Sequence, residues 1–162
     1  MVLDFSYSLS LGLQRIGLID TVDIFVDSVD FEYGEAKWVI VESIRQLYGE
    51  RLVASGLRIP DLYNWLFERM DDEVSYFVCE AGANILHHSG LPGAVFKVYF
   101  GERGFVISVS QQDSGFDCEI VLRDELKKQH GGGFSFFKSC CGIVFFDDIH
   151  AVKTVYYAYF FE

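Results

Sequence analysis

Residues that could do chemistry gather in three short stretches of the second half of the chain. In the first, a carboxylate at Glu80 and a carboxamide at Asn84 lie four positions apart. In a helix, side chains at this spacing leave the same face and point to one site. Such a pair suits a bound metal ion together with a water or hydroxyl. A solvated helix face is the simpler explanation for this pair alone.

The other two stretches extend the pattern. Asp113 follows a predicted strand and precedes Gly115, where a carboxylate can accept a hydrogen bond from an exocyclic amine such as that of adenine. Gly131 and Gly133 precede a helix predicted to begin at Phe134, whose free N–H groups suit a phosphate. Each stretch alone is also a common turn or hinge. Their order and their structural contexts together predict a nucleotide pocket.

These stretches resemble the motifs of the GHKL (histidine-kinase-like) ATPase superfamily. Residues 80–90, EAGANILHHSG, resemble its N-box, residues 113–115, DSG, its G1 box, and residues 131–134, GGGF, its G2 box. Within the superfamily the chain is most similar to the stand-alone anti-sigma-factor serine kinases. The resemblance covers roughly residue 71 to the C-terminus.

The resemblance implies a site for ATP and Mg²⁺. Asn84 would bind the Mg²⁺ that bridges the phosphates, and Asp113 would read the adenine amino group. Glu80 would be the general base, accepting a proton from a seryl or threonyl hydroxyl as the γ-phosphoryl group is attacked in line. The phosphate-covering lid would be shaped by Gly115, Gly131 and Gly133, and Phe134 of the G2 box would be a further cofactor-binding residue.

Two departures from the family pattern concern this lid. Asp117 stands where the pattern has its second glycine; it can adopt a left-handed conformation but brings negative charge near the phosphates. The lid over residues 117–130 is short and lacks the arginine often found before the G2 glycines, which leaves Lys127, Lys128 and His130 as cations. ATP binding is therefore better supported than phosphoryl transfer. A catalytically inactive adaptor and a structural domain without a nucleotide site remain alternatives.

Composition sets the class of protein. With 162 residues, of which 51% are hydrophobic and 17% aromatic, the chain predicts a single domain over 1–162, with residues 1–20 as an N-terminal extension of unassigned structure. A net charge of −11 works against nucleic-acid binding. The family resemblance implies as partner a regulatory protein resembling an anti-anti-sigma or sigma factor, and it also implies a homodimer.

The same sequence predicts a cytoplasmic protein. No apolar run reaches the roughly 18 residues of a membrane span, and Asp4 with no basic cluster argues against a signal peptide. The cysteines lack a CxxC spacing and are expected to be reduced thiols; they are Cys79, Cys118, Cys140 and Cys141.

Periodicity and turn residues predict the elements that must position the site. Helices are expected over residues 33–52, 61–70, 71–88 and 134–141, and strands over residues 21–26, 96–100, 105–110, 143–146 and 152–161. The segment 117–130 is expected to be a mobile loop with at most one helical turn. The predicted fold class is α+β: a two-layer α/β sandwich in which helices cover one face of a mixed, mostly antiparallel sheet, as in the Bergerat-type ATP-binding fold.

Overall fold

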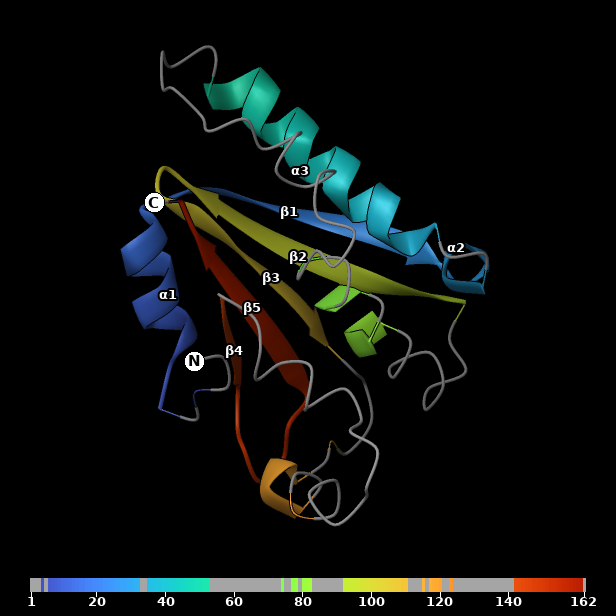
Figure 1. Cartoon of the computed structure of the whole chain (residues 1–162), viewed down its shortest axis with the longest axis vertical. Helices are drawn as coiled ribbons and strands as arrows, with labels where there is room; N and C mark the ends of the chain where they lie inside the picture. Colours follow the sequence, from blue (N-terminus) through green and yellow to red (C-terminus); the bar gives the residue numbers. More distant parts are fainter. Residues whose placement is uncertain are drawn as a thin grey trace.

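A five-stranded antiparallel sheet organises the chain in the computed structural model (Figure 1). The structure describes residues 4, 6–32, 35–52, 74, 77, 78, 80–82, 92–110, 115, 117–120, 123 and 142–161. The strands are β1 (Leu18–Asp27), β2 (Gly93–Gly101), β3 (Gly104–Ser110), β4 (Ile143–Phe146) and β5 (Thr154–Phe160), in the spatial order β1-β2-β3-β5-β4. Each described pair of neighbouring strands is antiparallel, so the expected mixed sheet is corrected to an antiparallel one.

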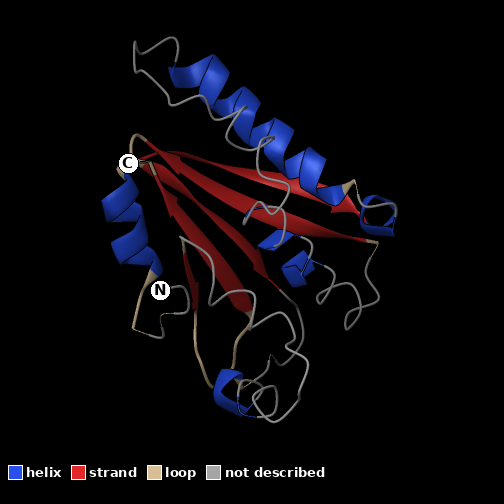
Figure 2. Cartoon of the chain, in the orientation of Figure 1, coloured by secondary structure: helices blue, strands red, loops and turns tan. Residues whose placement is uncertain are grey.

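Helices lie beside this sheet (Figure 2). They are α1 (Leu9–Ile16), α2 (Ser28–Glu32) and α3 (Ala36–Leu52), and further helical residues occur between positions 74 and 82. The helix predicted over residues 33–52 is thereby confirmed, as are the strand predicted over 21–26, the hairpin and the two closing strands. The predicted helices over 61–70 and 134–141 lie outside the described residues. No helix in the described ranges has both the length and the apolar character needed to cross a membrane.

One face of the sheet, here called the main face, carries the larger apolar core. Its strand residues alternate along each strand, as Ile24 and Val26 do on β1 and Phe105, Ile107 and Val109 on β3. Against them pack Ala36, Ile40 and Ile44 of α3 and the helical residues Val74, Phe77 and Val78, all buried. The apolar residues that recur at helical spacing in α3 therefore face the sheet.

The opposite face, here called the second face, is covered by α1. Tyr7 and Ile16 form a smaller apolar cluster there with Val106, Phe145 and Ala158 of β3, β4 and β5. The prediction that helices cover one face only is therefore wrong. The physical reason is that these strands are apolar on both sides, so each side needs a cover.

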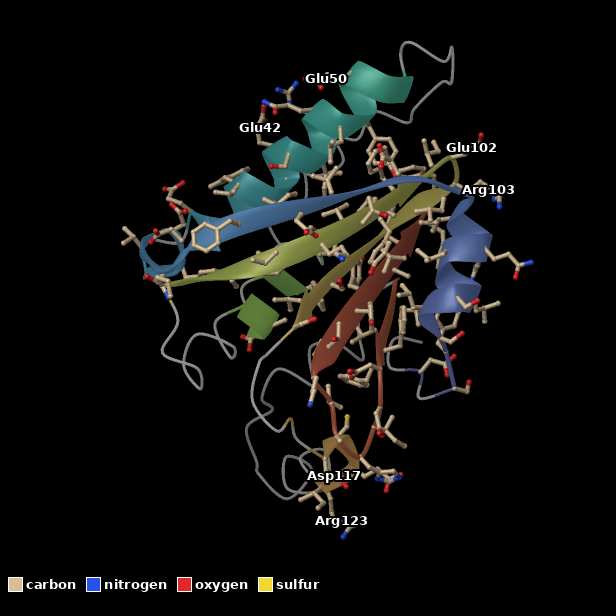
Figure 3. The ribbon with its side chains drawn as sticks, turned by 180° about the vertical axis from the view of Figure 1, so that it is seen from behind. Glu42, Glu50, Glu102, Arg103, Asp117 and Arg123 are labelled. Carbon is tan, nitrogen blue, oxygen red and sulfur yellow. The ribbon has the colours of Figure 1, made fainter. Side chains whose placement is uncertain are left out.

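The position of α1 is set by caps at both of its ends. The Ser8 side chain accepts a hydrogen bond from the Leu11 N–H at 3.2 Å, and Gly17 ends the helix at φ 66°. Arg103, in the β2–β3 turn, donates from its guanidinium to the Gln14 and Arg15 carbonyls at 3.0 and 2.9 Å. Figure 3 shows Arg103 beside this end of α1. The turn thus supplies donors for the last carbonyls of a helix that begins the chain.

Candidate functional site

Two of the predicted site residues, Glu80 and Gly115, belong to the part of the chain that the structure describes. The other predicted site residues lie outside the described residues; they are Asn84, Asp113, Gly131, Gly133 and Phe134.

Glu80 is helical and half-buried, and its helix is seated on the main face of the sheet. The neighbouring Phe77, Val78 and Ala81 are buried in the main-face core. A Cβ added to Gly82 would lie 2.4 Å from the Phe31 ring and 3.0 Å from that of Phe96, so glycine permits the close approach of this helix to β2. The glycine inside the first motif therefore fixes how closely the Glu80 helix approaches the sheet.

Gly115 lies a few residues beyond the end of β3 in a conformation that requires glycine. Its φ is +79°, and an added Cβ would lie 2.5 Å from the Val152 carbonyl oxygen, before β5. A larger side chain would clash with main chain rather than with a movable side chain. The backbone at this point is therefore held in one turn against the segment that leads into β5.

Asp117 has a local structural role. Its carboxylate accepts a hydrogen bond from the Ile120 N–H at 3.1 Å and lies 3.3 Å from Nδ1 of His150. Its pKa is lowered, first by the Ile120 hydrogen bond and then by His150. Its φ is not positive, so Asp117 does not take the left-handed conformation that a glycine in the family pattern allows. The Asp117 carboxylate therefore interacts with the start of a helical turn, through the Ile120 N–H, and with the His150 imidazole.

The residue after Asp117 anchors the same segment to the core. The Cys118 N–H donates to the Ile149 carbonyl oxygen at 2.7 Å, and its thiol is buried in the main-face cluster that also contains Phe77 and Val78. Burial raises the pKa of the Cys118 thiol to about 12. The helix carrying Glu80 and the segment after Gly115 thus pack in one apolar cluster on one face of the sheet.

The pairing of Asp117 with His150 was missed by sequence reasoning because 33 residues separate them. The sequence places His150 beside Asp147 and Asp148, but Asp147 accepts hydrogen bonds from the Lys153 and Thr154 N–H groups, both at 3.1 Å. Figure 3 shows Asp117 and Arg123 at the end of the molecule opposite Arg103. Within the described ranges, no three His, Cys, Asp or Glu side chains gather to hold a metal ion.

The helix of Glu80 and the segment that follows Gly115 therefore both contribute side chains to the main-face core, and Gly82 and Gly115 each stand where a larger side chain would clash. In comparisons with known proteins, the chain matches no family model, no curated protein and no solved structure.

Proposed function

We propose that the chain is an ATP-binding regulatory domain similar to the anti-sigma-factor serine/threonine kinases. It would bind Mg-ATP and phosphorylate or sequester a regulatory protein resembling an anti-anti-sigma or sigma factor. The observation that carries the proposal is the ordered set of three motifs in an α+β chain. Two of them have a described anchor: the Glu80 helix packs on the sheet, and Gly115 turns the chain after β3 at φ +79°.

The side chains suit the proposed ligands chemically. Amide and carboxylate oxygens are ligands that Mg²⁺ accepts, and Asn84 would hold this ion, which when bound offsets phosphate charge. Asp113 would accept a hydrogen bond from the adenine amino group. Glu80, half-buried at the edge of an apolar core, would take the proton from the attacking hydroxyl. The net charge of −11 makes this local compensation necessary.

Calorimetry of Mg-ATP binding tests the proposal. Asp113→Asn and Asn84→Ala should each weaken binding by about tenfold or more, since the first replaces a charged hydrogen-bond acceptor with a neutral one and the second removes a metal ligand. Glu50→Gln, an exposed carboxylate on α3, is the matched control and should leave the affinity unchanged. Unchanged affinity for Mg-ATP in both site variants would rule out the proposed nucleotide pocket.

A second candidate is a catalytically inactive adaptor that acts through protein contacts, with or without bound nucleotide. Asp117 favours it, because its carboxylate stands where the family pattern has glycine and is held by Ile120 and His150. Labelled ATP, supplied with purified candidate partner proteins, separates the two functions. Transfer of label that disappears in Glu80→Gln supports the kinase, whereas nucleotide binding without transfer supports the adaptor.

A further inference from the structure

The second face of the sheet is hollowed beside α1. A cavity of about 350 Å³ opens there, near the lower end of the roughly 300–1,000 Å³ range of small-molecule sites. Its lining comes from β1, β2, β3 and β5: Asp23, Gly93, Ala94, Val95, Lys97, Tyr99, Ser108, Ser110, Thr154 and Tyr156. We call this cavity the sheet hollow.

Strand register explains why the surface is hollow at this place. Asp23, Lys97, Ser108 and Tyr156 lie directly opposite one another on β1, β2, β3 and β5. Ser108 is the smallest of the four and lies between the long side chains of Lys97 and Tyr156, so it forms a low floor between two walls. The hollow is therefore a consequence of one small residue in a cross-strand row.

The next cross-strand row continues the polar floor. Ser110 and Thr154 face each other, and their hydroxyl oxygens lie 2.8 Å apart. With Ser108, Tyr99 and Tyr156, five hydroxyl-bearing residues line the hollow. Ser108 lies deepest, at 4% exposure, and its hydroxyl donates to the Lys97 carbonyl oxygen at 3.4 Å. Hydroxyls both donate and accept hydrogen bonds, so this surface matches a ligand that does the same.

The walls add an aromatic ring and a balanced charge pair. Phe145 stacks on the Tyr156 ring with centroids 4.9 Å apart, and it is the β4 neighbour of Tyr156 in the register. On the other side of Tyr156 lies the low Ser108, so that side of the ring borders the hollow. At the far wall Lys97 Nζ lies 3.9 Å from Asp23 Oδ1. One positive and one negative charge leave the hollow without a net preference for anions.

We propose that the sheet hollow binds a neutral polyhydroxylated ligand of mono- or disaccharide size, through its five hydroxyls, the Asp23–Lys97 pair and the Tyr156 ring. An anion is disfavoured because Lys97 is paired with Asp23 and the chain carries a net charge of −11. An apolar ligand is disfavoured because it would strip water from the hydroxyls and from the ion pair without replacing their hydrogen bonds. A sugar supplies hydroxyls to the floor and an apolar ring face to Tyr156.

The sheet hollow is separate from the proposed nucleotide site. Apart from Ala94, which belongs to the main-face core, its lining side chains alternate with the core residues of the same strands, as Ser108 does with Ile107 and Val109. They therefore leave the sheet on the second face, whereas the Glu80 helix packs on the main face. Failure of ATP binding leaves this proposal standing, and the reverse also holds.

Titration of ¹⁵N-labelled protein with maltose, followed by amide chemical shifts, tests the proposal. Shifts are expected at residues 93–97, 108–110 and 154–156. Ser108→Leu fills the floor and should weaken maltose binding about tenfold or more, while Ser10→Leu, the same change at an exposed position of α1, should leave it unchanged. Ser110→Ala removes one hydroxyl with little risk to the fold and should weaken binding about threefold.

Inorganic phosphate is the competing probe. It should leave the same amides unshifted. Shifts with phosphate but not with maltose, maltose shifts confined to other parts of the chain, or full maltose affinity in folded Ser110→Ala would each overturn the proposal.

Discussion

The two faces of the sheet differ in what the same strands present to them. Neighbouring positions on β1 and β2 show the contrast: Phe96 of β2 is fully buried on the main face, whereas Phe25 of β1 is 55% exposed on the second face. The main face is a continuous apolar core under α3 and the helix of Glu80. The second face is apolar under α1, polar over much of the sheet hollow, and carries exposed apolar side chains at Phe25 and Val95. We infer that the main face maintains the fold and that the second face is free to specialise.

The largest expected effect comes from truncating one phenylalanine on each face. Phe96→Ala should lower the free energy of unfolding by about 3–5 kcal/mol, because it removes a fully buried ring and leaves a cavity. Phe25→Ala should change it by less than about 0.5 kcal/mol. Urea unfolding followed by circular dichroism measures both. Equal losses would contradict the contrast between the faces.

Two helical glycines compare the packing of helices on the two faces. Gly82→Ala should destabilise by about 1–3 kcal/mol, because the new Cβ would lie 2.4 Å from the Phe31 ring. Gly12→Ala in α1 should stabilise by up to about 1 kcal/mol, since its Cβ meets Tyr7 at 3.4 Å and Val106 at 3.6 Å and alanine favours the helix. Thermal denaturation of the two variants measures the sign of each stability change. A stabilising Gly82→Ala would contradict the close packing of the Glu80 helix against Phe31.

Two buried tyrosines make the third comparison. On the main face, the Tyr48 hydroxyl donates to the Gly104 carbonyl oxygen at 2.8 Å and also lies 3.2 Å from that of Gly101. On the second face, the Tyr7 hydroxyl is buried and finds no hydrogen-bond partner in the described structure.

Removing each hydroxyl tests this difference. Tyr48→Phe should cost about 1 kcal/mol, whereas Tyr7→Phe should be neutral or slightly stabilising. Chemical denaturation of both variants at one pH is the measurement. A larger loss for Tyr7→Phe would show that its hydroxyl has a partner.

The last expected effect is a dependence on alkaline pH, small near pH 9.0 and growing as the pH rises. The pKa of Cys118 rises from the ordinary 9.0 to about 12 in the folded state because the thiol is buried on the main face. Between these pH values the unfolded chain loses the thiol proton and the folded chain keeps it, so stability falls as pH rises above 9.0. Unfolding of wild type and Cys118→Ala across this range should show a shallower decline in the variant. Parallel declines would show that the thiol ionises equally in both states.

Much of the fold could be predicted from local sequence. Strand β1 is recognisable from the alternation of Val22, Ile24 and Val26, and the β2–β3 turn from the glycines at both of its ends. Both signals depend only on residues close in sequence, and the structure confirms the strand and the hairpin. The spacing of Ala36, Ile40 and Ile44 likewise gave α3.

The helix α1 was missed although its signals are present. Ser8 is an N-cap residue, Gly17 follows the last turn, and Leu9, Leu13 and Ile16 have helical spacing. The prediction of a one-sided cover also overlooked Val106, Phe145 and Ala158, which are apolar on the second face.

The candidate site was less predictable because its contacts join distant segments. The motifs identified Glu80 and Gly115 as candidate site residues. The Asp117–His150 pair and the fit of Gly82 against Phe31 depend instead on tertiary packing. The sheet hollow depends on strand register, which sets Ser108 between Lys97 and Tyr156. This register cannot be predicted from the sequence of a single strand.

The hydrogen bonds from Arg103 to the Gln14 and Arg15 carbonyls span 89 and 88 residues of sequence. On the ribosome, the first helix therefore emerges long before the guanidinium that completes its last turn. A short segment with unpaired carbonyls is marginal in water. The last turn of α1 therefore gains these two donors only after the β2–β3 turn has been synthesised and lies beside it.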